Sequence, residues 1–179
     1  MYLSTTYDSP VGVLTLCSDG VSLTGLWLDG QRHHGASIPA AMVAADGARP
    51  FAEVRAWLDS YFAGGQPAIS DLPLVPIGGE FRQYVWHILT EIPYGQVTTY
   101  GVIAEQVVAK MGKERMAPVA VGGAVGHNPI SIIIPCHRVV GADGNLTGYA
   151  GGIERKVQLL ELEGVDMSCL YVPKRGTAL

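Results

Sequence analysis

The sequence predicts an α/β (α+β) protein in two parts, a sheet-plus-helix domain over residues 1–75 and a mostly helical domain over residues 76–179. Short β-favouring runs divided by turn residues occupy residues 3–28, whereas helical periodicity dominates after residue 80. Between the two, residues 66–79 are rich in proline and glycine and have no helical period. We therefore place the domain boundary in that stretch.

The first domain is predicted to begin with strands. The turn Asp8–Gly12 precedes the β-favouring run Val13–Leu16, and a second turn, Ser18–Gly20, precedes Leu23–Leu28. Residues 31–47 have no clear periodicity and are predicted as loop. A helix is predicted over residues 50–62, because apolar residues recur there at i, i+3, i+4, i+7 and i+8. These residues are Val54, Trp57, Leu58, Tyr61 and Phe62.

Four helices are predicted in the second domain. The first starts near Phe81, with Val85, Ile88 and Leu89 on the same face, and is closed by Pro93–Gly95. The second spans Tyr100–Met111 and is capped by Thr98 or Thr99. The third spans Pro118–Val125, with proline in its first turn, and the last spans Ile153–Glu163 before Gly164.

The composition favours a protein of the cytoplasm. Residues 1–10 have neither the basic start nor the apolar stretch of a secretory signal, and no apolar run approaches the length of a membrane span. The three cysteines, Cys17, Cys136 and Cys169, are odd in number and lack CxxC spacing. This pattern argues for a reducing compartment and against a disulfide framework or a cysteine zinc site.

The charge is unevenly distributed. The chain carries a net charge of −4, and residues 1–79 account for it, with three arginines against seven acidic residues. Residues 80–179 carry nine basic and nine acidic residues, and they contain all four lysines. A nucleic-acid surface, if the protein has one, is expected in the second domain as a local patch.

The most informative segment is Ile134–Val140, in which Cys136 is followed directly by His137 and Arg138. A thiol is a strong nucleophile only as the thiolate, and neighbouring cationic or basic groups favour that form. The motif therefore indicates a buried, activated cysteine. A Cys-His pair alone is weak support, because a buried histidine is often only a well-packed core residue.

Several separate motifs follow one another in the second domain. They are Phe81–Trp86, Ile92–Gly95 followed by Thr99-Tyr100, Ala120–Gly122, Asn128-Pro129, Pro135–Val139, Thr147–Gly152, and Leu159-Leu160 ahead of Glu163-Gly164. With these motifs in this order the chain resembles the O6-alkylguanine-DNA alkyltransferase family, closely over residues 81–164 and more loosely before them. A match to all of them in this order is very improbable by chance.

The resemblance implies DNA repair by irreversible transfer of an alkyl group from O6 of guanine, and less efficiently from alkylated thymine, to Cys136. The product is a thioether, which has no carbonyl for water to attack, so the thiol is not regenerated and one molecule repairs one base. No metal or organic cofactor is required. His137 would draw the thiol proton through a water, and Glu163 would orient His137. Sequence alone does not place Glu163 near His137, and a solvent-exposed helix residue is the alternative interpretation.

Further roles follow from the same resemblance. Tyr100 would donate a proton to the departing base, although a tyrosine at a helix start is more often a packing residue. Asn128 would tie the preceding helix to the cysteine turn. Because a base inside a duplex cannot reach a buried cysteine, the nucleotide must be flipped out.

The resemblance also assigns the binding surfaces. A winged-helix-like helix-turn-helix would place its second helix, Pro118–Val125, in the minor groove, although close packing against another helix is an alternative interpretation of its small residues. The carbonyls of Cys136 and Val139 would accept from the guanine amine, and the glycine-rich loop 148–152 would cover the base. The residues assigned to substrate are Val139, Tyr149, Ala150, Gly151 and Lys156, and those assigned to DNA are Val119, Ala120, Gly122, Gly123 and Arg138. Arg138 has a structural alternative, an ion pair with an unnamed partner.

The chain departs from the family pattern in three places. Many members carry an arginine immediately before Ala120, where this chain has Val119, which predicts weaker or slower flipping. The segment 101–117 looks a few residues longer than in short members of the family. It contains Lys110, Lys113 and Arg115, which we interpret as charges exposed to solvent, with contacts to DNA phosphates as the alternative interpretation. Cys17, His33 and His34 do not have the spacing of the zinc site found in some members, so no metal is expected.

Three other functions remain open at this level. An alkyl-lesion sensor that binds damaged DNA without repairing it would lack a cysteine at the nucleophile position. A thiol hydrolase would leave the helix-turn-helix unexplained, and a winged-helix transcription factor would leave the Cys-His turn unexplained. We expect a monomer that binds double-stranded DNA containing O6-alkylguanine and does not bind a membrane.

Overall fold

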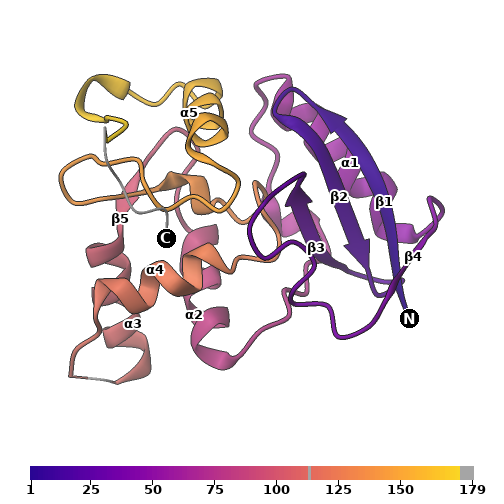
Figure 1. The fold of residues 1–179 in the computed structure, drawn as a ribbon, viewed down its shortest axis with the longest axis horizontal. Helices are drawn as coiled ribbons and strands as arrows, with labels where there is room; N and C mark the ends of the chain where they lie inside the picture. The colour runs from indigo at the N-terminus through magenta and orange to yellow at the C-terminus, as the bar shows by residue number, and fades with distance from the viewer. Residues whose placement is uncertain (113, 174–179) are drawn as a thin grey trace. The chain divides into compact units, whose positions relative to one another are not determined.

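A computed structural model describes residues 1–112 and 114–173 (Figure 1). The chain divides into two units, Met1–Gly78 with Pro129–Ile133, and Gly79–Asn128 with the residues from Ile134 onward. The first division falls at the end of the proline- and glycine-rich stretch, three residues after the boundary expected from sequence. The α/β architecture predicted from the sequence is confirmed.

The first unit is a four-stranded sheet with one long helix. Its strands are β1 (Tyr2–Ser9), β2 (Gly12–Ser18), β3 (Leu23–Leu28) and β4 (Met42–Ala44), in the order β3-β2-β1-β4. All pairs are antiparallel except β1 with β4. Strand β4 was expected to be loop, and the expectation was wrong because a three-residue strand with an exposed Val43 is too short to show alternation.

Helix α1 (Arg49–Phe62) belongs to the same unit and contacts β1 and β2 (Figure 1). Proline at its first turn, Pro50, suits a position whose N–H would have no helical partner. Its buried face holds the periodic residues predicted from sequence except Phe62, which is half-buried: Val54, Trp57, Leu58 and Tyr61. Burying this apolar face supplies most of the helix's stabilisation, since short helices are marginal on propensity alone.

Residues 129–133 return to the first unit, which corrects their assignment to a continuous domain 76–179. Strand β3 lies at the edge of the sheet, so its backbone groups there need partners. The N–H of Leu26 donates to the Pro129 carbonyl at 2.8 Å, and the N–H of Ser131 donates to the Leu26 carbonyl at 2.8 Å. The pairing of residues 129–133 with β3 could not be predicted, because it joins segments about 100 positions apart and leaves no periodicity in the local sequence.

The second unit contains α2 (Glu80–Thr90), α3 (Tyr100–Met111), α4 (Pro118–Gly126) and α5 (Ile153–Leu162). Each lies within about one residue of its predicted bounds, except that the start and end of α2 were only approximately predicted. The predicted cap of α3 is Thr99, whose Oγ1 accepts from the N–H of Val102 at 3.2 Å. The two-residue strands β5 (Thr98–Thr99) and β6 (Val139–Val140) pair in parallel and were not predicted.

The helices of the helix-turn-helix, α3 and α4, pack on each other and on α2. Trp86 of α2 is buried, and its Nε1 donates to the carbonyl of Ala124 at 2.9 Å. The buried apolar side chains of these three helices also include Val85, Leu89, Ile103, Val107, Val121 and Val125. Within the described residues, none of the helices has the length and apolar character needed to cross a bilayer.

Candidate active site

Cys136 begins a buried three-residue 3-10 turn, Cys136–Arg138, that leads into β6. Pro135 precedes the turn with φ −82°, and Val139 ends it in extended conformation, where β6 pairs with β5. The turn is therefore held at both ends by backbone constraints. Cys136 itself is only 4% exposed, so a substrate must be brought to the sulfur.

Asn128 lies two residues after the end of α4 and reaches the cysteine turn. Its Nδ2 donates to the Ile134 carbonyl at 2.8 Å and to Cys136 Sγ at 3.1 Å. The first bond fixes the chain just before the turn, and the second points a donor at the sulfur. A donor in this place stabilises the thiolate more than the thiol.

The resting thiol of Cys136 is nevertheless protonated. Burial raises its pKa to about 11, and the Asn128 hydrogen bond and the charge of Lys156 only partly offset this. The neighbouring Arg138 is occupied by a carboxylate, and burial lowers the pKa of His137. Proton removal must therefore accompany the reaction, and this is the step that the resemblance gives to His137.

His137 and Glu163 form a buried pair. His137 Nε2 lies 2.7 Å from Glu163 Oε1, and neither side chain is exposed. Burial opposes ionisation of Glu163, yet hydrogen bonds from His137 and Arg138 lower its pKa to about 2. Because the carboxylate can only accept, His137 carries its proton on Nε2, which leaves Nδ1 as a proton acceptor. That Nδ1 is buried and has no partner among the described residues.

Arg138 is also paired with Glu163, and this corrects its assignment as a DNA contact. Its Nε donates to Glu163 Oε2 at 2.8 Å, its Nη2 to Oε1 at 3.0 Å, and its Nη1 to the Ile92 carbonyl at 2.6 Å. Its side chain is only 7% exposed. The alternative interpretation of Arg138, an ion pair within the protein, therefore agrees with the structure, and the partner that the sequence did not reveal is Glu163.

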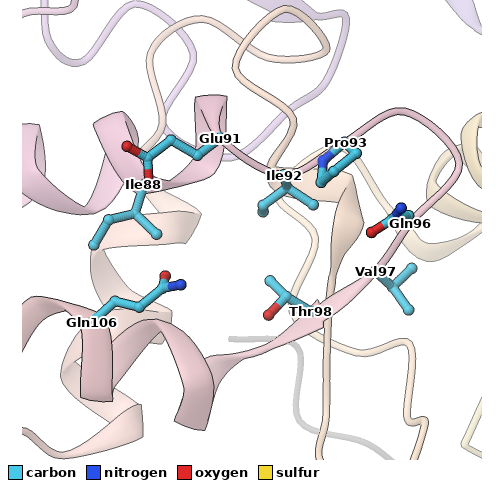
Figure 2. Close-up of a pocket in the computed structure, with 8 residues that line it drawn as sticks. All are labelled: Ile88, Glu91, Ile92, Pro93, Gln96, Val97, Thr98 and Gln106. Carbon is cyan, nitrogen blue, oxygen red and sulfur yellow. The ribbon is translucent and has the colours of Figure 1, made fainter.

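The turn Ile92–Gly95 completes this buried ionic group. The N–H of Gly95 donates to Glu163 Oε2 at 3.2 Å, and the Arg138 guanidinium lies 5.7 Å from the Tyr94 ring centre. A cavity of about 200 Å³ borders the same turn, with Ile88 of α2, Glu91 directly after α2, and Gln106 of α3 around it (Figure 2). The sequence marked the turn as a motif without showing what its backbone binds.

Tyr100 bridges the helix-turn-helix and the loop 147–152. Its hydroxyl donates to the carbonyls of Thr147 at 3.4 Å and Gly148 at 3.3 Å. Gly148 has φ +90°, and a Cβ there would lie 2.4 Å from the Tyr100 hydroxyl, so only glycine allows this approach. Burial and the nearby Cys136 raise the pKa of Tyr100 to about 12, which keeps its proton in place as a donor.

Lys156 of α5 is fully buried. Its Nζ donates to the Val139 carbonyl at 2.6 Å and, more weakly, to the Thr147 carbonyl at 3.4 Å. Burial lowers its pKa to about 8, while the charge of Cys136 opposes that shift. The lysine therefore links the cysteine turn to the loop 147–152, and Val139 already has a donor at the carbonyl expected to bind guanine.

Tyr149, Ala150 and Gly151 form the middle of that loop. The Tyr149 side chain is buried, and its ring lies edge-on to His137 with 6.4 Å between ring centres. Its hydroxyl has no partner among the described residues, and burial raises its pKa well above the ordinary value. Gly151 is buried and Ala150 half-buried, so the loop already lies over the cysteine turn rather than extending into solvent.

The second helix of the helix-turn-helix presents part of its assigned DNA surface. Val119 is 67% exposed, and Ala120 and Gly123 are exposed beside it. Gly122 is buried with Val121 and Ala124 on the packed side. Its assignment as a DNA contact is therefore corrected to a packing role.

The basic residues before α4 are differently placed. Lys110 lies 3.4 Å from Glu91, a surface pair of small energetic value. Arg115 is exposed, and Lys113 lies outside the described residues.

The other two cysteines lie away from this turn in the chain. Cys17 is buried in β2, where Thr24 donates to its sulfur at 3.6 Å, and Cys169 is exposed near the C-terminal end. In residues 1–112 and 114–173, no group of three or more His, Cys, Asp or Glu side chains is arranged to hold a metal ion.

Known protein families match both parts of the chain. The ribonuclease-like domain of 6-O-methylguanine DNA methyltransferase matches residues 2–76, and the DNA binding domain of the same family matches residues 80–165. A methylated-DNA–protein-cysteine methyltransferase of Haemophilus influenzae is 44% identical over 161 residues, which cover 90% of this chain and 86% of that protein.

Solved structures agree. The Mycobacterium tuberculosis OGT in complex with DNA has a TM-score of 0.78 and 46% identity, covering 90% of this chain and 91% of that one. The O6-methylguanine-DNA methyltransferase of Pyrococcus kodakaraensis has a TM-score of 0.61 and 26% identity, with 92% and 100% coverage. The chain therefore belongs to the 6-O-methylguanine DNA methyltransferase family.

Proposed function

We propose that this protein repairs DNA by transferring an alkyl group from O6 of guanine, and less efficiently from O4 of thymine, irreversibly to Cys136. The contact that carries the proposal is Asn128 Nδ2 to Cys136 Sγ at 3.1 Å, beside the buried pair of His137 and Glu163. This arrangement supplies a nucleophile, a base and a residue that orients the base. The relatives named as methylated-DNA–protein-cysteine methyltransferases support the same reaction.

The chemical step begins with the proton of Cys136. His137 Nδ1 is the acceptor, through a water, and the resulting imidazolium is balanced by Glu163, which keeps its charge because its pKa is about 2. The thiolate forms a sulfur–carbon bond with the alkyl carbon while the carbon–O6 bond breaks. The electron pair of that bond goes to the base, which takes up one proton and leaves as guanine.

Tyr100 is the proposed donor of that last proton. Its hydroxyl is protonated at neutral pH and lies at the loop 147–152, which would cover the base. The thioether on Cys136 has no carbonyl or good leaving group, so water does not regenerate the thiol. One protein molecule therefore acts once.

The base must leave the duplex before this step, since Cys136 is buried. We assign the DNA contact to the exposed side of α4, with Val119 as the apolar side chain that supports the vacated stack. The related OGT of Mycobacterium tuberculosis solved with DNA supports duplex DNA as the partner. A monomer in the cytoplasm remains our expectation.

The proposal is tested by intact and peptide mass spectrometry after incubation with a duplex carrying one O6-methylguanine. We expect one methyl group per protein molecule, located on Cys136, with Cys17 and Cys169 unmodified as internal controls. Cys136→Ser should remain unmodified while still binding the duplex. Preferential binding without methyl transfer would instead support a lesion sensor, and release of many repaired bases per protein would exclude a single-use reaction.

A further inference from the structure

Helix α5 ends at Leu162, and two of its last carbonyl groups are bonded by the residues that follow. Gly164 has φ +70°, the left-handed conformation that commonly ends a helix. Its N–H donates to the Glu161 carbonyl at 3.0 Å, and the N–H of Val165 donates to the Leu160 carbonyl at 3.0 Å. These two bonds form a Schellman motif. The motif does not supply a donor for the carbonyl of Leu162.

Tyr94 supplies that donor. Its hydroxyl donates to the Leu162 carbonyl at 3.2 Å, although 68 positions separate the two residues. Burial and the nearby charge of Glu163 raise the pKa of this hydroxyl, so it remains a protonated donor at neutral pH. Because Glu163 directly follows Leu162, the bond lies one residue from the carboxylate that contacts His137.

The C-terminal end of a helix is an unfavourable place for a carboxylate. The carbonyl groups there carry partial negative charge, which opposes ionisation of the Glu163 side chain. A hydroxyl that donates to the Leu162 carbonyl offsets part of this charge. The bond from Tyr94 therefore favours the ionised form of Glu163, which an imidazolium at His137 needs as its counter-charge.

The Tyr94 ring also contacts the second partner of Glu163. The Arg138 guanidinium lies 5.7 Å from the ring centre, a distance at which an aromatic face attracts a cation. The adjacent Gly95 has φ +74°, and a Cβ there would lie 3.0 Å from the Glu163 carbonyl, so glycine allows the turn to approach the end of α5. Tyr94 thus contacts both the end of α5 and the arginine that binds Glu163.

We propose that Tyr94 is a positioning residue for the reaction, because it fixes the Glu163 carboxylate against Nε2 of His137. Its effect passes through the end of α5 and through Arg138. The inference rests on the proposed function, in which His137 accepts the thiol proton of Cys136. A displaced carboxylate would bind the Nε2 proton less well, and the imidazole would then populate the tautomer with its proton on Nδ1. That tautomer cannot accept the proton of Cys136 at Nδ1.

The test measures the tautomer of His137 by nuclear magnetic resonance of protein labelled with 15N. Protonated and unprotonated ring nitrogens differ strongly in 15N chemical shift, and the His137 signals are assigned by their absence from His137→Gln. We expect the wild-type protein to carry the proton on Nε2 at neutral pH. Tyr94→Phe, which keeps the ring and removes the hydroxyl, should move the two shifts toward each other. Tyr94→Leu should move them further.

The same variants should transfer methyl more slowly from a duplex carrying O6-methylguanine. We expect the single-turnover rate to fall about fivefold in Tyr94→Phe, the equivalent of one hydrogen bond. It should fall about 20-fold or more in Tyr94→Leu, which also loses the ring beside Arg138. Tyr7→Phe is the matched control, because it removes the bond of another half-buried tyrosine, to Asp59 at 2.7 Å in the first unit. It should change neither the His137 shifts nor the rate.

The two proposals fail in different ways. Wild-type His137 shifts in both Tyr94 variants overturn the positioning role, even where stability is lost, and so does an unchanged rate in both. Changes in Tyr7→Phe equal to those in Tyr94→Phe overturn it as well. If Tyr94→Leu does not fold, Tyr94→Phe alone gives both measurements. Absence of methyl transfer by the wild-type protein overturns the proposed function, while the His137 shifts still decide whether Tyr94 fixes the pair.

Discussion

Glu163 Oε1 lies 2.7 Å from His137 Nε2, although 26 positions separate the two residues in the chain. The same carboxylate accepts from Arg138 and from the N–H of Gly95. The buried Glu163 carboxylate thus fixes the tautomer of His137, balances the charge of Arg138, and binds the backbone of the turn Ile92–Gly95. Removing its charge should therefore disturb the chemistry and the fold together.

Replacing Glu163 with glutamine should affect both stability and rate. Glu163→Gln leaves the buried Arg138 without its counter-charge, which costs about 3 kcal/mol of unfolding free energy. His137 also loses the carboxylate that balances its imidazolium, so methyl transfer should slow by about 100-fold. Urea unfolding and single-turnover kinetics measure the two effects. Glu161→Gln, at an exposed acid in the last turn of α5, should change neither, and equal behaviour of the two variants would contradict the assignment.

The pKa of Glu163 also predicts how stability depends on acid. The pKa is about 2 in the folded protein, against an ordinary value of 4.5 for an unperturbed glutamate, so the unfolded chain binds the proton first as pH falls. The contribution is fully present above about pH 4.5 and is lost as pH falls toward 2. The unfolding free energy of the wild-type protein should therefore fall more steeply across this window than that of Glu163→Gln. Parallel curves would show that Glu163 does not carry this contribution.

Asn128→Asp tests the hydrogen bond to the nucleophile with almost no change in shape. The amide donor to Cys136 Sγ becomes a carboxylate, which raises the thiol pKa further and repels the thiolate. We expect methyl transfer to slow by about 100-fold at neutral pH, corresponding to about 2.7 kcal/mol. Asn145→Asp, at a side chain whose oxygen accepts from the N–H of Thr147, is the control. A normal rate in Asn128→Asp would remove Asn128 from the chemistry.

Lys156 should make stability rise with pH in the alkaline range. Its pKa is about 8 in the folded protein, against an ordinary value of 10.5 for an unperturbed lysine, so between these values the unfolded state binds more protons. The unfolding free energy of the wild-type protein minus that of Lys156→Met should increase from about pH 8 to about pH 10.5. Methyl transfer in the variant should also slow, because the thiolate loses a nearby positive charge. A difference that stays constant with pH would contradict the shifted pKa.

Val119→Arg should strengthen the DNA interaction. The side chain at this position is 67% exposed on α4, and an arginine there adds a donor for the orphaned base and a positive charge. We expect higher affinity for duplex DNA or faster repair, measured by fluorescence anisotropy and single-turnover kinetics. Val43→Arg, at an exposed valine of β4, adds the same charge elsewhere and should have no comparable effect. If both variants gain equally, the added charge and not the position is responsible.

The sequence by itself determined the helices and the reactive motif. Helical periodicity located α1, and cap, proline and glycine signals located α3, α4 and α5, each to about one residue. The order of short motifs identified Cys136, His137 and Asn128 as one site. These features are local: a helix face repeats every three to four residues, and the motif residues adjoin or closely follow one another in the chain.

Only the tertiary structure decided which distant groups meet. It paired Glu163 with His137 and Arg138, buried Arg138 and Gly122, and placed the Lys156 ammonium against the Val139 carbonyl. It also returned residues 129–133 to the edge of β3. A buried polar group must form hydrogen bonds, and its partner is whichever group the packed fold places beside it, often from a distant part of the chain. The periodicity of the sequence does not indicate which group that is.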